Sequence, residues 1–322
     1  MNIFNIQSEE AFNDACLDAF KLQSQTIKIY KEFILALGVK PENVKHYTQI
    51  PFLPVEFFKS HQIIEDQAFA DIEFTSSGTT GSQTSKHFVQ DISIYENSYL
   101  KGFEHFYGPI TEICILALLP NYLERSGSSL IYMFEDLIKK TKHLKSGFFL
   151  YNHDELSETL IELKKKKQKT MLIGVTYALL DFVEKHQIEF PELIVMETGG
   201  MKGQRKEMVR EELHQTLCKG FGVNRIHSEY GMTELLSQGY SKGDGVFNCP
   251  AWMKVLIRDT NDPLTLLLQQ KTGGINVIDL ANIHSCSFVA TQDLGKSNID
   301  GSFEILGRFD NSDIRGCNLM IG

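Results

Sequence analysis

The spacing of hydrophobic positions changes several times along the chain, and each spacing predicts a different element. Residues 8–37 follow a helical period, because Phe12, Cys16 and Phe20 fall on one face. Ser8 can cap the start of such a helix, and Gly38 is a typical stop signal. We therefore expect one helix over residues 8–37.

Short apolar runs alternate with amphipathic stretches through the middle of the chain. The apolar runs are typical of buried strands and lie at 112–119, 170–175 and 192–200. The stretches with helical spacing lie near 93–107, 128–140, 155–168, 176–187 and 204–219. This β-then-α order predicts an α/β fold with a mostly parallel sheet and helices on both of its faces.

The pattern changes again after residue 245. The segments "WMKVLIRD", "GGINVIDL" and "GSFEILGR" read as short strands separated by Gly, Asp and Asn. We therefore predict two parts packed as one body. Residues 1–245 would form the α/β core, and residues 246–322 a smaller β-rich subdomain with a short C-terminal tail.

Composition narrows the class of protein. A net charge of −9 over 322 residues argues against a nucleic-acid surface, and the one dense basic cluster, Lys164–Lys167, reads as a solvated helix end rather than a polyanion site. The sequence shows neither a signal peptide nor an apolar run long enough to span a membrane. The six cysteines lie far apart without a CxxC pair, which disfavours disulfides and zinc. A cytoplasmic protein with reduced thiols fits these features.

One polar segment, "FTSSGTTGSQTSK" at residues 74–86, has the composition of an anion-binding loop. Glycines let successive backbone N–H groups point inward, and hydroxyls donate further hydrogen bonds. A polar surface loop without a ligand is the alternative. The segment is not a Walker loop, since the fifth residue after Gly78 is Gln83 rather than glycine. The chain also lacks a GxGxxG dinucleotide fingerprint and a GxSxG nucleophile elbow.

Four further segments follow this loop in order: "TGG" (198–200), "SEYGMTE" (228–234), "ATQDLG" (290–295) and "GRFDNSDIRG" (307–316). With these five segments in this order, the chain resembles the adenylate-forming enzymes, which join a carboxylic acid to ATP as acyl-AMP. The resemblance spans residues 74–316 and implies the fold of the large N-terminal domain of that superfamily. Within the superfamily, "IPFLPVEFFKS" and the short end after "GRFDNSDIRGCNLM" resemble bacterial acyl-protein synthetases of fatty-acid reductase systems. The phenylacetate–CoA ligases are the alternative relatives.

The resemblance implies ATP and Mg²⁺ as cofactors and assigns roles to the matching residues. Tyr230 would stack on adenine, Thr233 would bind the α-phosphate, and Glu234 would hold Mg²⁺ and act in catalysis. Asp293 would accept the ribose hydroxyls and Arg308 would bind ribose or phosphate oxygens. The remaining nucleotide-binding candidates are Ser76, Ser77, Gly78, Thr79, Thr80, Gly81, Lys86, Gly199, Gly200, Gly231 and Met232.

Two departures from the superfamily pattern stand out. The phosphate loop lacks the usual Pro-Lys, so Lys86 comes later than the loop lysine does in the superfamily. The usual mobile C-terminal domain, with its adenylation lysine, is also expected to be absent.

Cys317 lies where acyl-protein synthetases carry a thioester-forming cysteine, and Arg315 could lower its pKa. We therefore expect a fatty or other apolar acid to be activated and passed through Cys317 to an acyl-accepting partner protein, a reductase or a carrier. The alternatives are an acyl-CoA or acyl-carrier ligase, in which Cys317 is incidental, and a non-catalytic nucleotide-binding relative.

Overall fold

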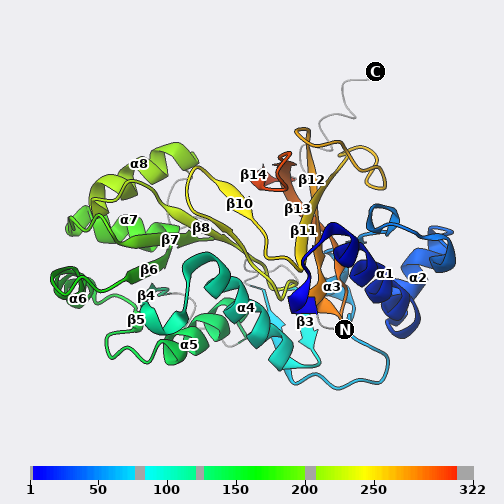
Figure 1. The fold of residues 1–322 in the computed structure, drawn as a ribbon, viewed down its shortest axis with the longest axis horizontal. Helices are drawn as coiled ribbons and strands as arrows, with labels where there is room; N and C mark the ends of the chain where they lie inside the picture. Colours follow the sequence, from blue (N-terminus) through cyan, green and yellow to red (C-terminus); the bar gives the residue numbers. More distant parts are fainter. Residues whose placement is uncertain (1–2, 77–83, 121–126, 200–207, 310–322) are drawn as a thin grey trace. The chain divides into compact units, whose positions relative to one another are not determined.

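The computed structural model describes residues 3–76, 84–120, 127–199 and 208–309. Contacts divide these residues into two compact units, whose elements are labelled in Figure 1. Unit 1 combines the described parts of 1–70, 88–90 and 251–322, and unit 2 combines those of 71–87 and 91–250. This grouping differs from the predicted boundary after residue 245, because residues 1–70 lie with the C-terminal strands. The packing of the two predicted parts as one body stays a prediction.

Unit 2 contains the α/β core. Its helices are α4 (Ile92–Tyr107), α5 (Ser129–Thr141), α6 (His153–Lys165), α7 (Thr176–Lys185) and α8 (Arg210–Phe221). Its strands are β2 (Ile72–Thr75), β4 (Cys114–Leu118), β5 (Gly147–Phe149), β6 (Thr170–Val175), β7 (Ile194–Thr198), β8 (His227–Tyr230), β9 (Gly239–Ser241) and β10 (Val246–Asn248). A short strand β3 (Lys86–Val89) pairs with β2 in a separate two-stranded sheet.

The main strands of unit 2 run in the order β10-β9-β8-β7-β6-β4-β5. The five strands from β8 to β5 are parallel, and β9 and β10 extend them in antiparallel pairing. Figure 1 shows α7 and α8 on one face of these strands and α4 and α5 on the other. The predicted mostly parallel sheet with helices on both faces is therefore confirmed.

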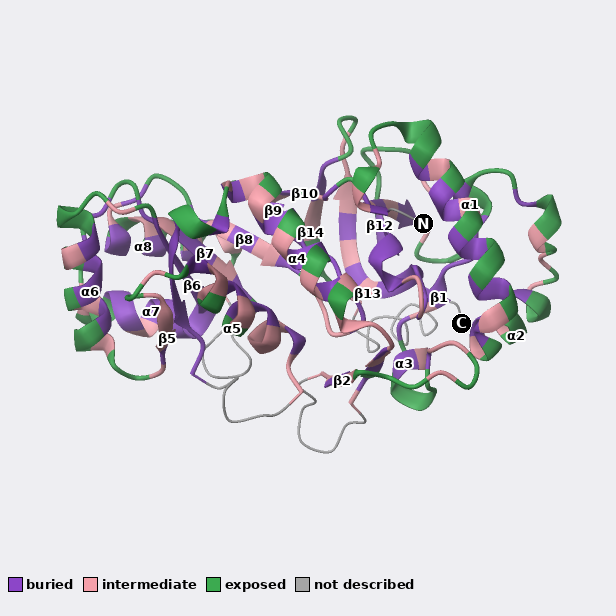
Figure 2. Ribbon diagram, turned by 60° about the horizontal axis from the view of Figure 1, so that its bottom comes forward, coloured by how far each residue is buried: buried purple, intermediate pink, exposed green. Residues whose placement is uncertain are grey.

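Burial explains why the sequence predicts the central strands correctly. Every residue of β4 and β6 is buried, as Figure 2 shows for β6, because helices cover both faces of a parallel sheet. A strand buried on both faces is expected to form a continuous apolar run rather than an alternating one. The run "CILAL" is apolar throughout, and "TMLIGV" is apolar after its first residue, Thr170. The predicted strands at 112–119, 170–175 and 192–200 correspond to β4, β6 and β7.

Unit 1 contains the antiparallel strands. Its helices are α1 (Glu9–Thr26), α2 (Lys28–Ala36) and α3 (Phe57–Ser60), and its strands are β1 (Leu53–Pro54), β11 (Met253–Arg258), β12 (Thr272–Asp279), β13 (Phe288–Ser297) and β14 (Phe303–Arg308). Successive strands from β11 to β14 pair antiparallel. The short β1 pairs parallel with the first part of β13, at Val289 and Ala290.

The single helix predicted over residues 8–37 is wrong, because the chain breaks at Ile27. Ser8 caps α1 as expected, since its hydroxyl accepts a hydrogen bond from the backbone N–H of Ala11 at 3.1 Å. Ile27 is extended (φ −107°, ψ 101°) and fully buried. The break lets Phe20 of α1 and Tyr30 of α2 pack on one core residue, Phe288, with ring centroids 6.2 and 6.3 Å away.

A buried amide explains why the N-terminal helices belong with the C-terminal strands. Gln23 of α1 is fully buried, and its side-chain amide donates to the carbonyl of Asn282 and the hydroxyl of Ser287, both at 2.9 Å. Its oxygen accepts from the backbone N–H of Ser287 at 3.1 Å. A buried amide with all these partners specifies one docking register for α1.

None of the helices in the described ranges is both long enough and apolar enough to cross a bilayer.

Candidate functional site

The carboxyl ends of β6 and β7 meet at one edge of the parallel sheet, where open α/β folds bind ligands. Gly199 follows β7 with a φ of 67°, in the left-handed region that glycine adopts without strain. The hydroxyl of Thr176, the first residue after β6, donates to the Gly199 carbonyl at 2.5 Å. This hydrogen bond links the carboxyl ends of β6 and β7. Gly199, which was predicted to let a nucleotide approach closely, therefore lies at the edge where ligands bind in such folds.

Tyr230 ends the neighbouring parallel strand β8 at the same edge. Its ring is 7% exposed and packs edge-on against Phe247, with centroids 6.2 Å apart. Gly231 follows directly, and a Cβ atom at that position would come within 2.5 Å of Glu229 Oε1. Glycine is therefore required there as long as the Glu229 carboxyl keeps its place. The structure brings the predicted residues Gly199, Tyr230 and Gly231 to the ends of two adjacent strands.

Glu229 is a partly buried acid at this edge that sequence reasoning missed. It pairs in register with Thr198 of β7, whose hydroxyl donates to Glu229 Oε2 at 2.7 Å. The residue keeps partial exposure, but burial of the carboxyl group raises its pKa to about 7, and the nearby Glu197 acts in the same direction. Near neutral pH, Glu229 can therefore donate a hydrogen bond in one protonation state and accept one in the other.

A histidine from β3, His87, makes a hydrogen bond to the backbone of the turn after β8. The backbone N–H of Leu235 donates to the Met232 carbonyl at 3.1 Å, which closes the turn. His87 Nδ1 lies 2.8 Å from the carbonyl oxygen of Thr233, so Nδ1 carries the proton and donates. Burial lowers the pKa of His87 to about 4, so the ring is neutral near pH 7. The signal for this role is faint in the sequence, since His87 stands 146 positions from its partner.

Glu234 lies in the same turn and is 7% exposed. As an ionisable oxygen ligand it is suited to Mg²⁺, a hard cation that keeps several waters and is held partly by substrate phosphates. No group of three His, Cys, Asp or Glu side chains within the described ranges could hold a metal by itself. A single carboxylate therefore fits a metal that arrives with the phosphates of a nucleotide.

The structure describes the predicted phosphate loop only at its two flanks. Ser76 and Ser85 close it, because the backbone N–H of Ser76 donates to the Ser85 carbonyl at 3.0 Å and that of Ser85 to the Ser76 hydroxyl at 2.8 Å. Lys86 pairs with Glu73 across the two-stranded sheet at 2.9 Å, with half of its side chain exposed. Such surface pairs are worth about 0.2–1 kcal/mol, so this one does not prevent Lys86 from binding an anion.

Several predicted site residues lie outside the described residues: Ser77, Gly78, Thr79, Thr80, Gly81, Gly200 and Cys317.

Asp293 and Arg308 are two of the predicted nucleotide-binding residues, and the structure places them side by side in unit 1. They are register partners on β13 and β14, and Arg308 Nε donates to Asp293 Oδ1 at 3.0 Å. Asp293 is 6% exposed, whereas the Arg308 side chain is 75% exposed. The arginine therefore holds the buried carboxylate in one orientation, while most of the arginine side chain lies in solvent.

The cysteines in the described ranges behave as packing residues. Cys16, Cys114 and Cys286 are buried, and Cys218 and Cys249 are half-buried. Burial raises the pKa of the Cys114 thiol to about 11 and that of Cys286 to about 12. Thiols with raised pKa values carry little thiolate and are poor nucleophiles.

The family profile described as "Acyl-protein synthetase, LuxE" matches residues 2–322. Comparison with curated proteins finds no match. Among solved structures, ATP-bound MatB from Rhodopseudomonas palustris aligns with a TM-score of 0.56 and 16% identity over 76% of this chain and 49% of its own. A 2-hydroxyisobutyryl-CoA ligase in complex with 2-HIB-AMP aligns with a TM-score of 0.72 and 11% identity over 94% of this chain and 68% of its own. The chain therefore spans about half the length of MatB, and these two likenesses establish the fold.

Proposed function

Because the chain belongs to the LuxE family of acyl-protein synthetases, we propose that it activates a fatty or other apolar carboxylic acid with ATP. The acid's carboxylate attacks the α-phosphorus, pyrophosphate leaves, and acyl-AMP remains. The observation that carries this proposal is the meeting of Gly199, Tyr230 and the turn bearing Glu234 at the carboxyl edge of adjacent parallel strands. That edge is where open α/β folds bind nucleotides.

In this proposal, each of three side chains binds a different part of the nucleotide. Tyr230 offers a ring whose position is fixed by Phe247, so little entropy is lost when adenine stacks on it. Asp293 accepts hydrogen bonds from the ribose hydroxyls, and its buried, oriented carboxylate suits that role. The Thr233 hydroxyl donates a hydrogen bond to the α-phosphate, and the hydrogen bond from His87 to the Thr233 carbonyl holds the backbone in place.

Glu234 would hold Mg²⁺ beside the phosphates. When bound, the ion supplies positive charge where negative charge builds up on the phosphate oxygens. The chain's own contribution is to orient a buried carboxylate, and burial excludes competing water from that group.

The second half of the proposal is acyl transfer to Cys317. Its thiolate attacks the acyl carbonyl carbon, the bond to AMP breaks, and AMP leaves as the thioester forms. Two observations support this step. Family membership implies an acyl-protein intermediate, and the described cysteines are buried or half-buried, with raised pKa values for Cys114 and Cys286. The thioester would then pass to a partner protein.

Pyrophosphate exchange into ATP, measured with a panel of acids of different chain length, tests the activation step. We expect exchange with at least one apolar acid and a loss of about 100-fold or more in Glu234→Ala. Glu158→Ala removes an exposed carboxylate of α6 in the same unit and should leave exchange unchanged. No exchange with any acid would rule out adenylation and favour a non-catalytic nucleotide-binding protein. Equal exchange in Glu234→Ala and the wild type would overturn the role of Glu234 in the activation step.

A second candidate is acyl transfer to coenzyme A, because the protein with the TM-score of 0.72 is itself a CoA ligase. Radiolabelled acid with ATP distinguishes the two. Label that stays on the denatured wild type and is lost from Cys317→Ser supports the thioester. Label that leaves the protein only when CoA is added, with Cys317→Ser fully active, supports the CoA ligase.

A further inference from the structure

The amino ends of the parallel strands, opposite the candidate nucleotide site, carry a surface cavity of about 370 Å³. Lys169 immediately precedes β6, Leu193 precedes β7, and His227 begins β8. Lys242 follows β9, which runs antiparallel to β8 and therefore ends at the same edge. His227 and Tyr230 stand at opposite ends of β8, about 10 Å apart at the usual strand rise. The cavity is thus separate from the edge that carries Gly199 and Glu234.

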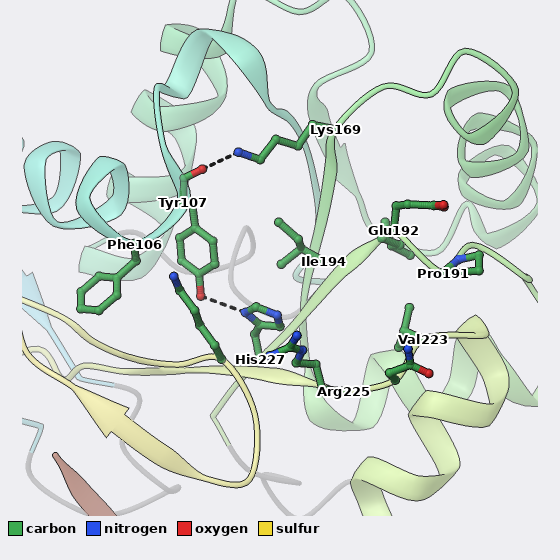
Figure 3. A pocket seen from close by; sticks show the side chains of 12 residues that line it. Phe106, Tyr107, Lys169, Pro191, Glu192, Ile194, Val223, Arg225 and His227 are labelled. Carbon is green, nitrogen blue, oxygen red and sulfur yellow. Dashed lines mark hydrogen bonds between the residues drawn. The ribbon is translucent and has the colours of Figure 1, made fainter.

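The charge of this cavity is opposite to that of the whole protein. Three cationic side chains, Lys169, Arg225 and Lys242, and one carboxylate, Glu192, line it, which leaves a net charge of +2 in a chain of net charge −9. Within the described part of the chain, no ion pair involves any of the three cations. Figure 3 shows the Glu192 carboxylate directed away from Tyr107 and His227. A concave surface lined by one sign of charge concentrates ions of the other sign.

The cations are held in place by packing rather than by acids. Lys169 Nζ donates to the Tyr107 carbonyl at 2.6 Å. Lys242 Nζ lies 6.0 and 5.8 Å from the ring centroids of Phe106 and Tyr107, within the range of a cation–π contact. Arg225 packs its aliphatic carbons on Gly243, where a Cβ atom would meet them at 3.4 Å. Positioned cations lose less entropy on binding an anion than free surface lysines do.

His227 lines the cavity, and its ring is affected by the charges of Arg225 and Lys242. Its Nδ1 lies 3.2 Å from the Tyr107 hydroxyl, and Figure 3 shows Tyr107 between Lys169 and His227. Burial lowers the pKa of His227 to about 4, with Arg225 and Lys242 acting in the same direction. The ring is therefore neutral near pH 7 and can offer a hydrogen bond without adding to the positive charge.

We propose that this cavity binds an organic phosphate, whose phosphate group contacts Arg225 and Lys242 and whose apolar part lies against Leu193 and Val223. A phosphate monoester carries close to two negative charges at neutral pH, which matches the lining, whereas a carboxylate would leave one positive charge uncompensated. Arg and Lys together are the usual phosphate-binding side chains. The volume is that of a small-molecule site. This site does not depend on the adenylation proposal, because none of its residues takes part in it.

Isothermal titration calorimetry with hexyl phosphate, hexanoate and inorganic phosphate tests the proposal. We expect hexyl phosphate to bind the wild type more tightly than the other two probes. The double variant Arg225→Gln/Lys242→Gln should weaken its binding by at least about 10-fold, the loss expected on removing two charge-assisted hydrogen bonds. The matched control Lys164→Gln/Lys165→Gln removes two exposed lysines of α6 in the same unit and should bind hexyl phosphate as the wild type does.

A second readout places the ligand. Bound phosphate offsets the positive charges around His227, so hexyl phosphate should raise the pKa of that ring in a histidine NMR titration, with the signal assigned from His227→Gln. If the double variant fails to fold, Lys242→Gln alone should still weaken binding by about 3-fold. The proposal is overturned by undiminished binding in the folded double variant, by an unmoved His227 pKa, by equal or tighter binding of hexanoate, or by no binding of any probe.

Discussion

The two edges of the parallel sheet in unit 2 differ in charge, burial and pKa, although the same strands supply both. At the carboxyl edge, Glu234 is buried and Glu229 is partly buried, and burial of the Glu229 carboxyl group raises its pKa to about 7. At the amino edge, Arg225 and Lys242 are exposed, and the pKa of His227 falls to about 4. Both of these groups lie on the four-residue strand β8, because His227 is its first residue and Glu229 its third.

This difference separates two kinds of phosphate recognition. The carboxyl edge offers acids, hydroxyls and a glycine-rich turn, which suit a nucleotide that brings its own metal ion. The amino edge offers cations, which suit a phosphate without a metal. The two edges should therefore respond to different substitutions, and each of the following experiments tests that separation.

The largest effect is expected from exchanging one charge at each edge. Glu234→Gln keeps the shape of the side chain but removes its charge, and should lower pyrophosphate exchange by about 100-fold. Lys242→Gln should change the same rate by less than about 2-fold, because it faces the opposite edge. Steady-state exchange on both purified variants measures the contrast. Equal losses in the two variants would show that the edges act as one site.

The sequence predicted one edge far better than the other. The carboxyl edge is encoded by contiguous segments such as "SEYGMTE", in which a glycine turn and a carboxylate stand beside an aromatic residue. The amino edge joins Lys169, Arg225 and Lys242, each of which reads alone as an ordinary surface residue. Only the pairing of β6, β7, β8 and β9 brings them to one cavity, and sequence spacing carries no signal of that pairing.

Local signals also explain which elements were predicted correctly. The strands β4 and β6 are buried on both faces and therefore contain unbroken apolar runs. Neither Gly nor Pro marks the break between α1 and α2 in the sequence. The break instead coincides with the complete burial of Ile27 within unit 1. Glu229 was missed since its partner, Thr198, lies 31 positions away on the neighbouring strand.

A smaller effect is expected on stability, with opposite pH dependence at the two edges. The pKa of Glu229 is raised from 4.5 to about 7 in the folded protein, so its protonated form is favoured by folding. Its stabilising contribution is complete below pH 4.5 and is lost as the pH rises through about 7. Relative to Glu229→Gln, the wild type should therefore lose about 2 kcal/mol of unfolding free energy between pH 4.5 and 7.5. Urea denaturation at a series of pH values measures this. A constant difference would mean that the carboxyl is solvated.

His227 should show the reverse trend, with a smaller amplitude because its ring is less deeply buried than the Glu229 carboxyl group. Its pKa falls from 6.5 to about 4 on folding, so the neutral form is favoured. That contribution is complete above pH 6.5 and is lost as the pH falls through about 4. Relative to His227→Gln, the wild type should lose about 1 kcal/mol between pH 7 and 4. The same urea series provides the measurement, and a loss in the same direction as that of Glu229 would contradict the assignment of the two edges.

The smallest effect isolates one charge at the amino edge. Lys242 contributes to the low pKa of His227, although burial contributes more. Lys242→Gln should therefore raise that pKa by about half a unit, while the buried ring keeps it below 6.5. A histidine NMR titration of the variant and of Lys164→Gln, an exposed lysine of α6, measures the change. Because Lys164 is outside the cavity, its variant should titrate as the wild type does. An unchanged pKa in Lys242→Gln would mean that solvent screens this lysine from the ring, and the amino edge would then owe its low histidine pKa to burial and Arg225.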